Sequence, residues 1–244
     1  MKIIGVIPAR YESSRFQGKP LVDICGKIMI ERVYLQAKKV KEIDEVIVAT
    51  DDDRIYSACI KRNIDCMITS NQHKTGTDRV GEVAKKVMAD IYVNIQGDEP
   101  LIEPETIRKA IIPFMEQTNS KIQVTNLMTC IKNPVDLINA TVPKVITSSE
   151  GRGIYLTRSA APFPKGSVNV DYYKQVCVYG FTPAALQYYC NAARGKIESI
   201  EDIEILRFIE AGYYVKFIEV DSDTIAVDTP HDLERVIAYI QEHE

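Results

Sequence analysis

The 244-residue chain has no tryptophan, only three histidines, and no apolar stretch close to the ~18 residues that a membrane-spanning helix needs. Its 30 lysines and arginines are outnumbered by 34 acidic residues, which gives a formal net charge of −4. A nucleic-acid-binding protein is not expected, because affinity for a phosphate backbone needs a clustered basic excess. Nor does the sequence predict a membrane partner.

The six cysteines are scattered, and no two of them have the C-x-x-C spacing. This pattern argues against a zinc site or a thioredoxin-type site and predicts reduced, buried thiols. The apolar run at residues 3–8 is shorter than the core of a signal peptide, and Arg10 and Glu12 follow at once. We therefore expect a cytoplasmic protein.

Short apolar runs alternate with segments of helical spacing through the first half of the chain. Buried strands are predicted at 3–8, 45–50, 66–69 and 91–95, and helices at 28–39, 54–61, 78–88 and 104–116. This alternation predicts right-handed βαβ units and an open, mostly parallel, twisted α/β sheet. Such sheets bind ligands beyond the carboxyl ends of their strands. The polar loops after Pro8, Thr50 and Ile95 are therefore expected at one edge.

The pattern changes after residue 122 to short apolar runs separated by turns. Strands are predicted at 124–127, 144–146, 154–156, 176–181 and 215–220, and a helix at 203–210. A last helix begins near Pro230, capped by Thr229 or Asp228. Because no linker is visible, we expect a single domain over 1–244 with a smaller mixed subregion at about 121–199.

The loop after the first strand concentrates positive charge. It carries Arg10, Arg15 and Lys19 together with two serines and Gly18. Three cations beside a glycine can neutralise a phosphate chain, although the loop is neither a Walker motif nor G-x-G-x-x-G. The alternative is a solvated basic turn.

Acidic residues follow other strands. Asp98, in the segment NIQGDEP, and Asp228, in VDTP, suit a magnesium ion that is held by one or two carboxylates and substrate phosphates, or they cap helices. The run 51–53 (DDD) resembles the metal motif of many glycosyltransferases but is also a common helix start, which we favour. In the segment 75–79, Thr77 or Asp78 is expected to cap a helix. The alternative is that the backbone of this segment forms hydrogen bonds to a nucleotide base or ribose.

Five segments together resemble one known family. Residues 4–30, 47–55, 75–83, 92–102 and 227–236 are similar, in order and spacing, to the CMP-Kdo synthetases, the 3-deoxy-manno-octulosonate cytidylyltransferases. The resemblance is dense over about the first 110 and the last 20 residues. It implies the open α/β fold of the nucleotide-diphospho-sugar transferases, a homodimer, and Mg²⁺ as cofactor.

The implied activity is that of a CTP-dependent nucleotidyltransferase. CMP would pass from CTP to the anomeric hydroxyl of a 2-keto sugar acid, with release of pyrophosphate, giving a CMP-sugar for cell-surface polysaccharide. The resemblance assigns CTP and magnesium to about 1–120 and 200–244. It assigns acceptor binding and dimerisation to about 121–199.

The resemblance also implies the site residues. Nucleotide contacts are expected from Ala9, Arg10, Ser14, Arg15, Lys19, Thr77, Asp78 and Arg79. The expected catalytic residues are Arg10, Arg15, Lys19 and Asp98, and the expected Mg²⁺ ligands are Asp98 and Asp228. Acceptor contacts are expected from Gln96, Arg158, Gln175, Tyr179, Glu204 and Ile205.

The acceptor segments depart from the family pattern. Gln175 and Cys177 stand where the family has the histidine and glycine of K-H-x-G-x-Y, and Ile205 replaces the glutamine of E-Q-L-R. Because the loss of hydrogen-bonding groups alters selectivity, the acceptor is 3-deoxy-manno-octulosonate or a modified relative. Neutral divergence is the other interpretation.

Two other functions stay open: a glycosyltransferase that uses the acids at 51–53, and a nucleotide-binding module without turnover. Pyrophosphate release distinguishes them, because only the cytidylyltransferase forms it from CTP and an acidic sugar.

Overall fold

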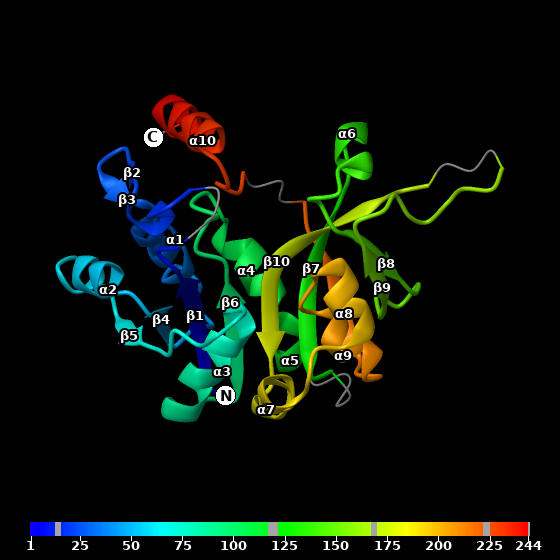
Figure 1. Ribbon diagram of the computed structural model, residues 1–244, viewed down its shortest axis with the longest axis horizontal. Helices are drawn as coiled ribbons and strands as arrows, with labels where there is room; N and C mark the ends of the chain where they lie inside the picture. Colours follow the sequence, from blue (N-terminus) through cyan, green and yellow to red (C-terminus); the bar gives the residue numbers. More distant parts are fainter. Residues whose placement is uncertain (13–15, 117–121, 167–169, 222–224, 244) are drawn as a thin grey trace. The chain divides into compact units, whose positions relative to one another are not determined.

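The computed structural model describes residues 1–12, 16–116, 122–166, 170–221 and 225–243 (Figure 1). The chain divides into two compact units. Unit 1 comprises Met1–Arg108 and Ser222–Glu244, and unit 2 comprises Lys109–Asp221. Within the described residues, no helix has the length and apolar character needed to span a lipid bilayer.

Unit 1 contains a parallel sheet. Its strands, in order across the sheet, are β6 (Ile91–Ile95), β1 (Ile3–Ala9), β4 (Glu45–Thr50) and β5 (Cys66–Ile68). Neighbouring strands pair in parallel, with Ala9 opposite Thr50 and Val6 opposite Asn94. The central strands are almost continuously buried, as expected for isoleucine- and valine-rich strands covered on both faces. The predicted mostly parallel α/β sheet is confirmed.

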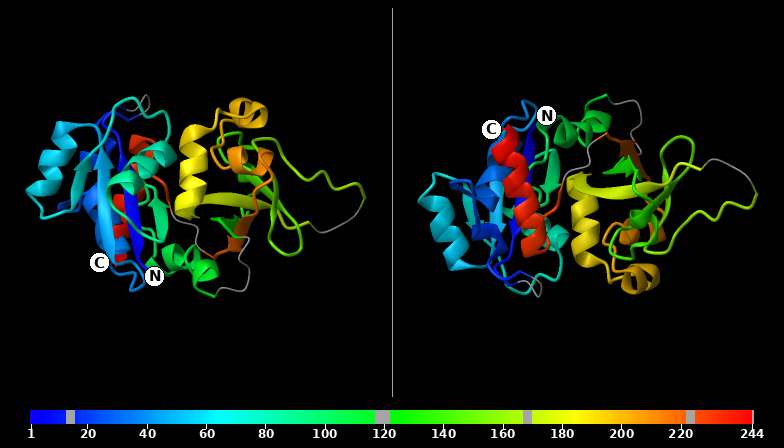
Figure 2. Two further views of the ribbon diagram at one scale, coloured as in Figure 1. Left: turned by 90° about the horizontal axis from the view of Figure 1, so that it is seen from below. Right: turned by 90° about the horizontal axis from the view of Figure 1, so that it is seen from above.

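Four longer helices accompany these strands: α1 (Met29–Ala37), α2 (Asp53–Ile60), α3 (Gly76–Lys86) and α10 (Pro230–His243). Shorter elements are the 3₁₀ turn η1 (Lys19–Leu21) and the hairpin of β2 (Asp23–Ile24) and β3 (Lys27–Ile28). Helix α10 packs Val236 and Ile240 against Ile24 and Met29 (Figure 2). This contact attaches the end of the chain to its first quarter.

Side-chain caps set where α2, α3 and α10 begin. Asp52 caps α2 by accepting from the backbone N–H of Arg54, so the helix-start interpretation of the acidic run is confirmed. Helix α3 begins with a capping box in which Thr75 and Asp78 bond reciprocally. Thr77 is therefore not the cap. At α10, Thr229 Oγ1 accepts from the N–H of Asp232.

The single helix predicted over 104–116 is wrong. The segment forms α4 (Pro104–Lys109) and a separate turn of helix, α5 (Ile112–Met115). Pro113 explains the break, because its ring lacks an N–H and would clash with the carbonyl of Lys109 in a continuous helix.

Unit 2 is a mixed sheet with helices. Its strands are β7 (Val124–Cys130), β8 (Lys144–Thr147), β9 (Gly153–Thr157), β10 (Tyr173–Phe181) and β11 (Val215–Glu219). Strand β11 runs parallel to β7, whereas the β7–β10, β10–β8 and β8–β9 pairs are antiparallel. Its remaining helices are α6 (Pro134–Ile138), α7 (Pro183–Asn191), α8 (Lys196–Glu201) and α9 (Leu206–Glu210).

A buried ion pair joins the last three helices of unit 2. Arg207 Nε and Nη2 donate to the two carboxylate oxygens of Glu198 at 2.7 and 2.6 Å. Nη1 donates to the carbonyl of Tyr189 at 2.8 Å, and the guanidinium lies 3.7 Å from the centroid of that tyrosine's ring. Both charged residues are buried, so neither has water to replace a lost partner.

We predict that Arg207→Met lowers the free energy of unfolding by about 3–5 kcal/mol in urea titrations, because it leaves the buried Glu198 carboxylate with only the more exposed Arg194, 3.4 Å away, as an ion-pair partner among the described residues. Adding Glu198→Leu to Arg207→Met should restore most of the lost free energy of unfolding. Arg62→Met, which removes a surface pair with Glu31 and a hydrogen bond to the carbonyl of Ala58, should cost about 1 kcal/mol or less. A loss below 1 kcal/mol for Arg207→Met would contradict this account.

Candidate active site

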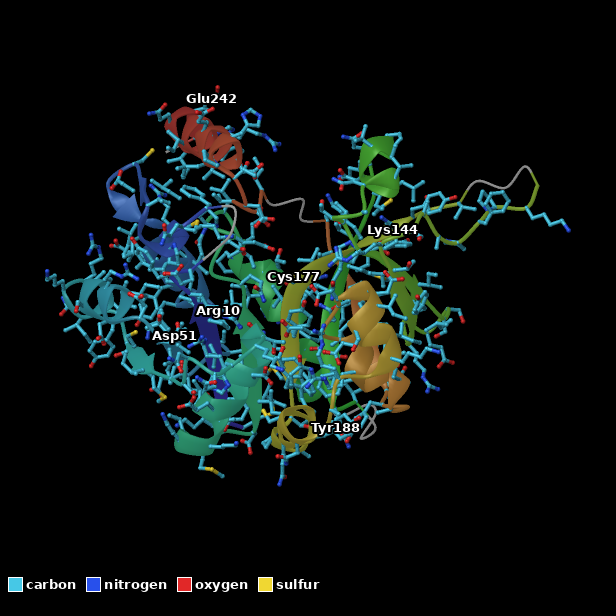
Figure 3. All side chains as sticks on the ribbon, viewed as in Figure 1. Arg10, Asp51, Lys144, Cys177, Tyr188 and Glu242 are labelled. Carbon is cyan, nitrogen blue, oxygen red and sulfur yellow. The ribbon has the colours of Figure 1, made fainter. Side chains whose placement is uncertain are left out.

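The loops that follow β1, β4 and β6 leave the sheet of unit 1 at one edge, because these neighbouring strands are parallel. Ala9 is buried at the end of β1, and Arg10 comes next with an exposed side chain. Figure 3 labels Arg10 and Asp51, the residues that follow the paired positions Ala9 and Thr50. Ser14 and Arg15, expected to contact the nucleotide, lie outside the described residues.

Lys19 connects two carboxylates from distant parts of the chain. Its Nζ donates to Asp98 Oδ2 at 2.8 Å and to Asp228 Oδ1 at 3.2 Å. The lysine side chain is 14% exposed, against 27% and 41% for the two aspartates. Burial alone would lower the pKa of Lys19, but the two carboxylates raise it above its usual value. The ammonium therefore stays charged at neutral pH.

The backbone also brings the two aspartates together. The N–H of Val227 donates to the carbonyl of Asp98 at 2.8 Å. The N–H of Asp228 donates to Asp232 at 3.2 Å, inside the cap of α10. Asp98 follows β6 and Asp228 precedes α10, so the sheet and the last helix jointly set the distance between the two carboxylates.

These residues fit a magnesium ion. Two carboxylates already share one cationic group, and Mg²⁺ is typically held by one or two carboxylates plus the phosphates of a substrate. A cage made by the protein alone is not present in the described ranges, where no group of three or more His, Cys, Asp or Glu side chains could hold a metal. Substrate phosphates would have to supply the remaining ligands.

The side chains at the start of α3 are mostly buried or bonded to other residues of unit 1. Arg79 is fully buried, donates to Thr69 Oγ1, and pairs with Asp51 at 3.1 Å. Thr77 is buried, and Asp78 belongs to the capping box. Their expected nucleotide contacts stay a prediction.

Gln96 directly follows β6 and is half-buried. The other expected acceptor residues belong to unit 2. Arg158 Nε donates to the carbonyl of Glu201 at 2.6 Å, and its Nη1 and Nη2 donate to the carbonyls of Ala140 and Asp202 at 2.9 and 3.1 Å. The Arg158 guanidinium is thus engaged with backbone oxygens, which a sugar carboxylate would have to replace.

A bulge in β10 carries Cys177, one of the residues that depart from the family pattern. The pairing of β10 with β7 shifts between Val176 and Tyr179, so Cys177 (labelled in Figure 3) lies at the irregularity. The buried Asn126 holds this bulge, because its Nδ2 donates to the carbonyls of Val176 and Val178, each at 2.9 Å. Bulges of this kind commonly redirect side chains beside active sites.

The same asparagine orients Gln175, whose Nε2 donates to Asn126 Oδ1 at 2.8 Å. Tyr179 is buried, and burial together with the nearby Cys177 and Glu204 raises the pKa of its hydroxyl well above the usual value, so it stays protonated. Ile205 is buried and Glu204 half-buried. Asn126 was not predicted, although a polar residue inside an apolar strand is a signal that marks it.

Comparisons with known proteins identify the family of the chain. A family model described as cytidylyltransferase matches residues 4–220. Over 244 residues the chain is 41% identical to the 3-deoxy-manno-octulosonate cytidylyltransferase of Fusobacterium nucleatum subsp. nucleatum, covering 100% of this chain and 98% of the relative. It is 42% identical to the enzyme of that name from Geotalea uraniireducens, covering 97% and 98%. The chain belongs to the 3-deoxy-manno-octulosonate cytidylyltransferase family.

A solved structure supports the same assignment. CMP:2-keto-3-deoxy-manno-octonic acid synthetase complexed with CTP matches this cytidylyltransferase with a TM-score of 0.95 at 37% identity, over 100% of both chains. A putative glucose-1-phosphate thymidylyltransferase from Bacillus anthracis matches with a TM-score of 0.71 at 15% identity, which shows a shared fold alone.

Proposed function

We propose that this cytidylyltransferase transfers CMP from CTP to the anomeric hydroxyl of 3-deoxy-manno-octulosonate and releases pyrophosphate. The convergence of Lys19, Asp98 and Asp228 carries the proposal, because it joins a phosphate-neutralising cation to a pair of metal-binding carboxylates. The names of the similar proteins identify the nucleotide and the sugar acid. We infer a role in cell-surface polysaccharide synthesis from the same family.

The chemistry needs positioning and charge neutralisation more than covalent help. The acceptor oxygen forms a bond to the α-phosphorus as the bond to pyrophosphate breaks on the opposite side. Negative charge grows on the departing phosphates, where the Lys19 ammonium and the exposed Arg10 guanidinium stabilise it. Arg15, which the family resemblance places in the same loop, is proposed to share this task.

We propose Asp98 and Asp228 as the ligands of Mg²⁺. A bound magnesium ion supplies further charge neutralisation at the phosphates and lowers the pKa of the attacking hydroxyl. Before substrate arrives, the Lys19 ammonium offsets the repulsion between the two carboxylates.

Acceptor recognition is assigned to Gln96 and to the residues of unit 2. Arg158 offers charge to the sugar carboxylate, while Gln175 and the protonated Tyr179 offer hydrogen bonds to hydroxyl groups. An amide at 175 binds hydroxyl groups without titrating near neutral pH. The acceptor is therefore 3-deoxy-manno-octulosonate or a close relative with hydroxyls in the same places.

We also propose a homodimer in the cytoplasm. Unit 2 exposes large apolar side chains at Val135, Ile138 and Phe163, and the last is 87% exposed. A second copy of the chain would remove such surface from water. The cytoplasmic location rests on the substrate, because CTP is made and used there.

The glycosyltransferase alternative is weakened by the contacts of the acidic run. Asp51 pairs with Arg79, and Asp52 caps α2 while binding Arg54. Both carboxylates therefore already have structural partners, unlike a motif held ready for a metal.

We predict that Asp98→Asn lowers turnover about 100-fold or more, because it removes charge at the reacting phosphates while the fold is kept. Lys19→Ala should raise the KM for CTP more than the KM for the sugar acid. The assay is pyrophosphate release from CTP and Mg²⁺ with a panel of 2-keto sugar acids.

The matched control is Asp90→Asn, which alters an exposed carboxylate just before β6 that accepts from the N–H of Lys2. Its rate should stay within twofold of wild type. A near-normal rate for Asp98→Asn would refute the metal role, and a change confined to the acceptor KM in Lys19→Ala would refute the loop assignment.

The acceptor assignment predicts that Gln175→Leu raises the KM for the sugar acid about tenfold and leaves the KM for CTP within twofold, because it removes one hydrogen bond to a hydroxyl. Gln187→Leu, an exposed glutamine on α7, is the control and should change neither value. A larger effect on CTP than on the sugar would remove Gln175 from the acceptor site.

A further inference from the structure

Asp52, in the acidic run at 51–53 after β4, makes contacts that the proposed reaction does not require. Asp52 caps α2 and also binds a side chain of the same helix: Oδ1 accepts from Arg54 Nε at 2.9 Å and Oδ2 from Nη2 at 2.6 Å. The Asp52 side chain is 17% exposed and that of Arg54 is 55% exposed. The carboxylate therefore fixes the plane of an otherwise exposed guanidinium.

That guanidinium is stacked on the loop after β1. Arg54 Cζ lies 3.3 Å from the centroid of the Tyr11 ring, and Nη2 lies 4.0 Å from Glu12 Oε1. Arginine stacks on aromatic faces through both its charge and its plane, so a carboxylate that sets the plane strengthens the contact. The contact links residues that follow two neighbouring strands, β1 and β4.

Tyr11 in turn closes the loop. The N–H of Gly18 donates to the carbonyl of Tyr11 at 2.9 Å, and a Cβ at Gly18 would lie 3.2 Å from the tyrosine ring. Gly18 has a φ of +69°, a conformation that favours glycine. The Tyr11 ring therefore contacts Arg54 and also lies close to Gly18, the residue that directly precedes Lys19.

We propose that Asp52, Arg54 and Tyr11 form a clamp that fixes the backbone of the phosphate-binding loop at Tyr11 and Gly18 and so positions the neighbouring Arg10 and Lys19 for the triphosphate. The inference rests on the proposed function, because it assigns CTP to that loop. The three residues are positioning residues: they act through the backbone of the loop, at Tyr11 and Gly18, and not through contact with the reacting atoms.

The clamp predicts a selective loss of nucleotide affinity. Arg54→Gln and Tyr11→Leu should each raise the Kd for CTP, measured by calorimetry, and the KM for CTP about two- to fivefold, the range expected for one exposed cation–π contact. The KM for the sugar acid should stay within twofold. Tyr11→Phe keeps the ring and should retain the wild-type Kd and KM for CTP. The double variant with Arg54→Gln and Tyr11→Leu should lose no more CTP affinity than either single variant.

Arg62→Gln is the matched control, since it removes an arginine just beyond the same helix that pairs with Glu31 at 3.2 Å. It should leave CTP affinity unchanged, and all variants should keep the wild-type melting temperature within about 3 °C. Unchanged CTP affinity in Arg54→Gln and Tyr11→Leu would overturn the clamp. So would a loss of CTP affinity in Tyr11→Phe as large as that in Tyr11→Leu. An equal rise of the KM for CTP and of the KM for the sugar acid would also overturn it. Absence of pyrophosphate release by the wild-type protein would instead refute the proposed function, and calorimetry with CTP would still test the clamp.

Discussion

The structure depends on placing one ammonium group between two carboxylates that lie 130 residues apart in the sequence. Lys19 belongs to the loop after the first strand, Asp98 follows β6, and Asp228 precedes the last helix. Two carboxylates held close together repel each other, and the partly buried lysine offsets that repulsion. The same concentration of charge suits a triphosphate with its metal. A parallel sheet achieves this because neighbouring strands deliver their loops to one edge.

The two units hold their functional side chains in place by different interactions. In unit 1, the buried strands are rigid, and the bond from the N–H of Val227 to the carbonyl of Asp98 ties the lead-in of α10 to the end of β6. In unit 2, polar side chains buried within the protein play the corresponding part: Asn126 holds the bulge of β10, and Glu198 with Arg207 joins three short helices. The proposed reaction thus uses a charged nucleotide site and a hydrogen-bonding acceptor site that are stabilised by different means.

The sequence predicted the strands of unit 1 and the start of α2 well, because continuous isoleucine and valine runs and an Asp cap are local signals. Its failures have different causes. The break at Pro113 was overlooked inside an apolar period, and α7 and α8 were missed because short helices of mixed character lack a clear period. The loop cations and metal-binding acids could be proposed from motifs. The stacking of Arg54 on Tyr11 could not, since it joins residues 43 positions apart that no pattern connects.

The most direct test of the central claim is anomalous diffraction from crystals grown with CTP and Mn²⁺. The account predicts one anomalous peak within metal–oxygen bonding distance, about 2.0–2.5 Å, of carboxylate oxygens from both Asp98 and Asp228, with Lys19 in contact with a phosphate oxygen. A nucleotide-associated peak that touches neither aspartate, or a triphosphate bound away from Lys19, would contradict it.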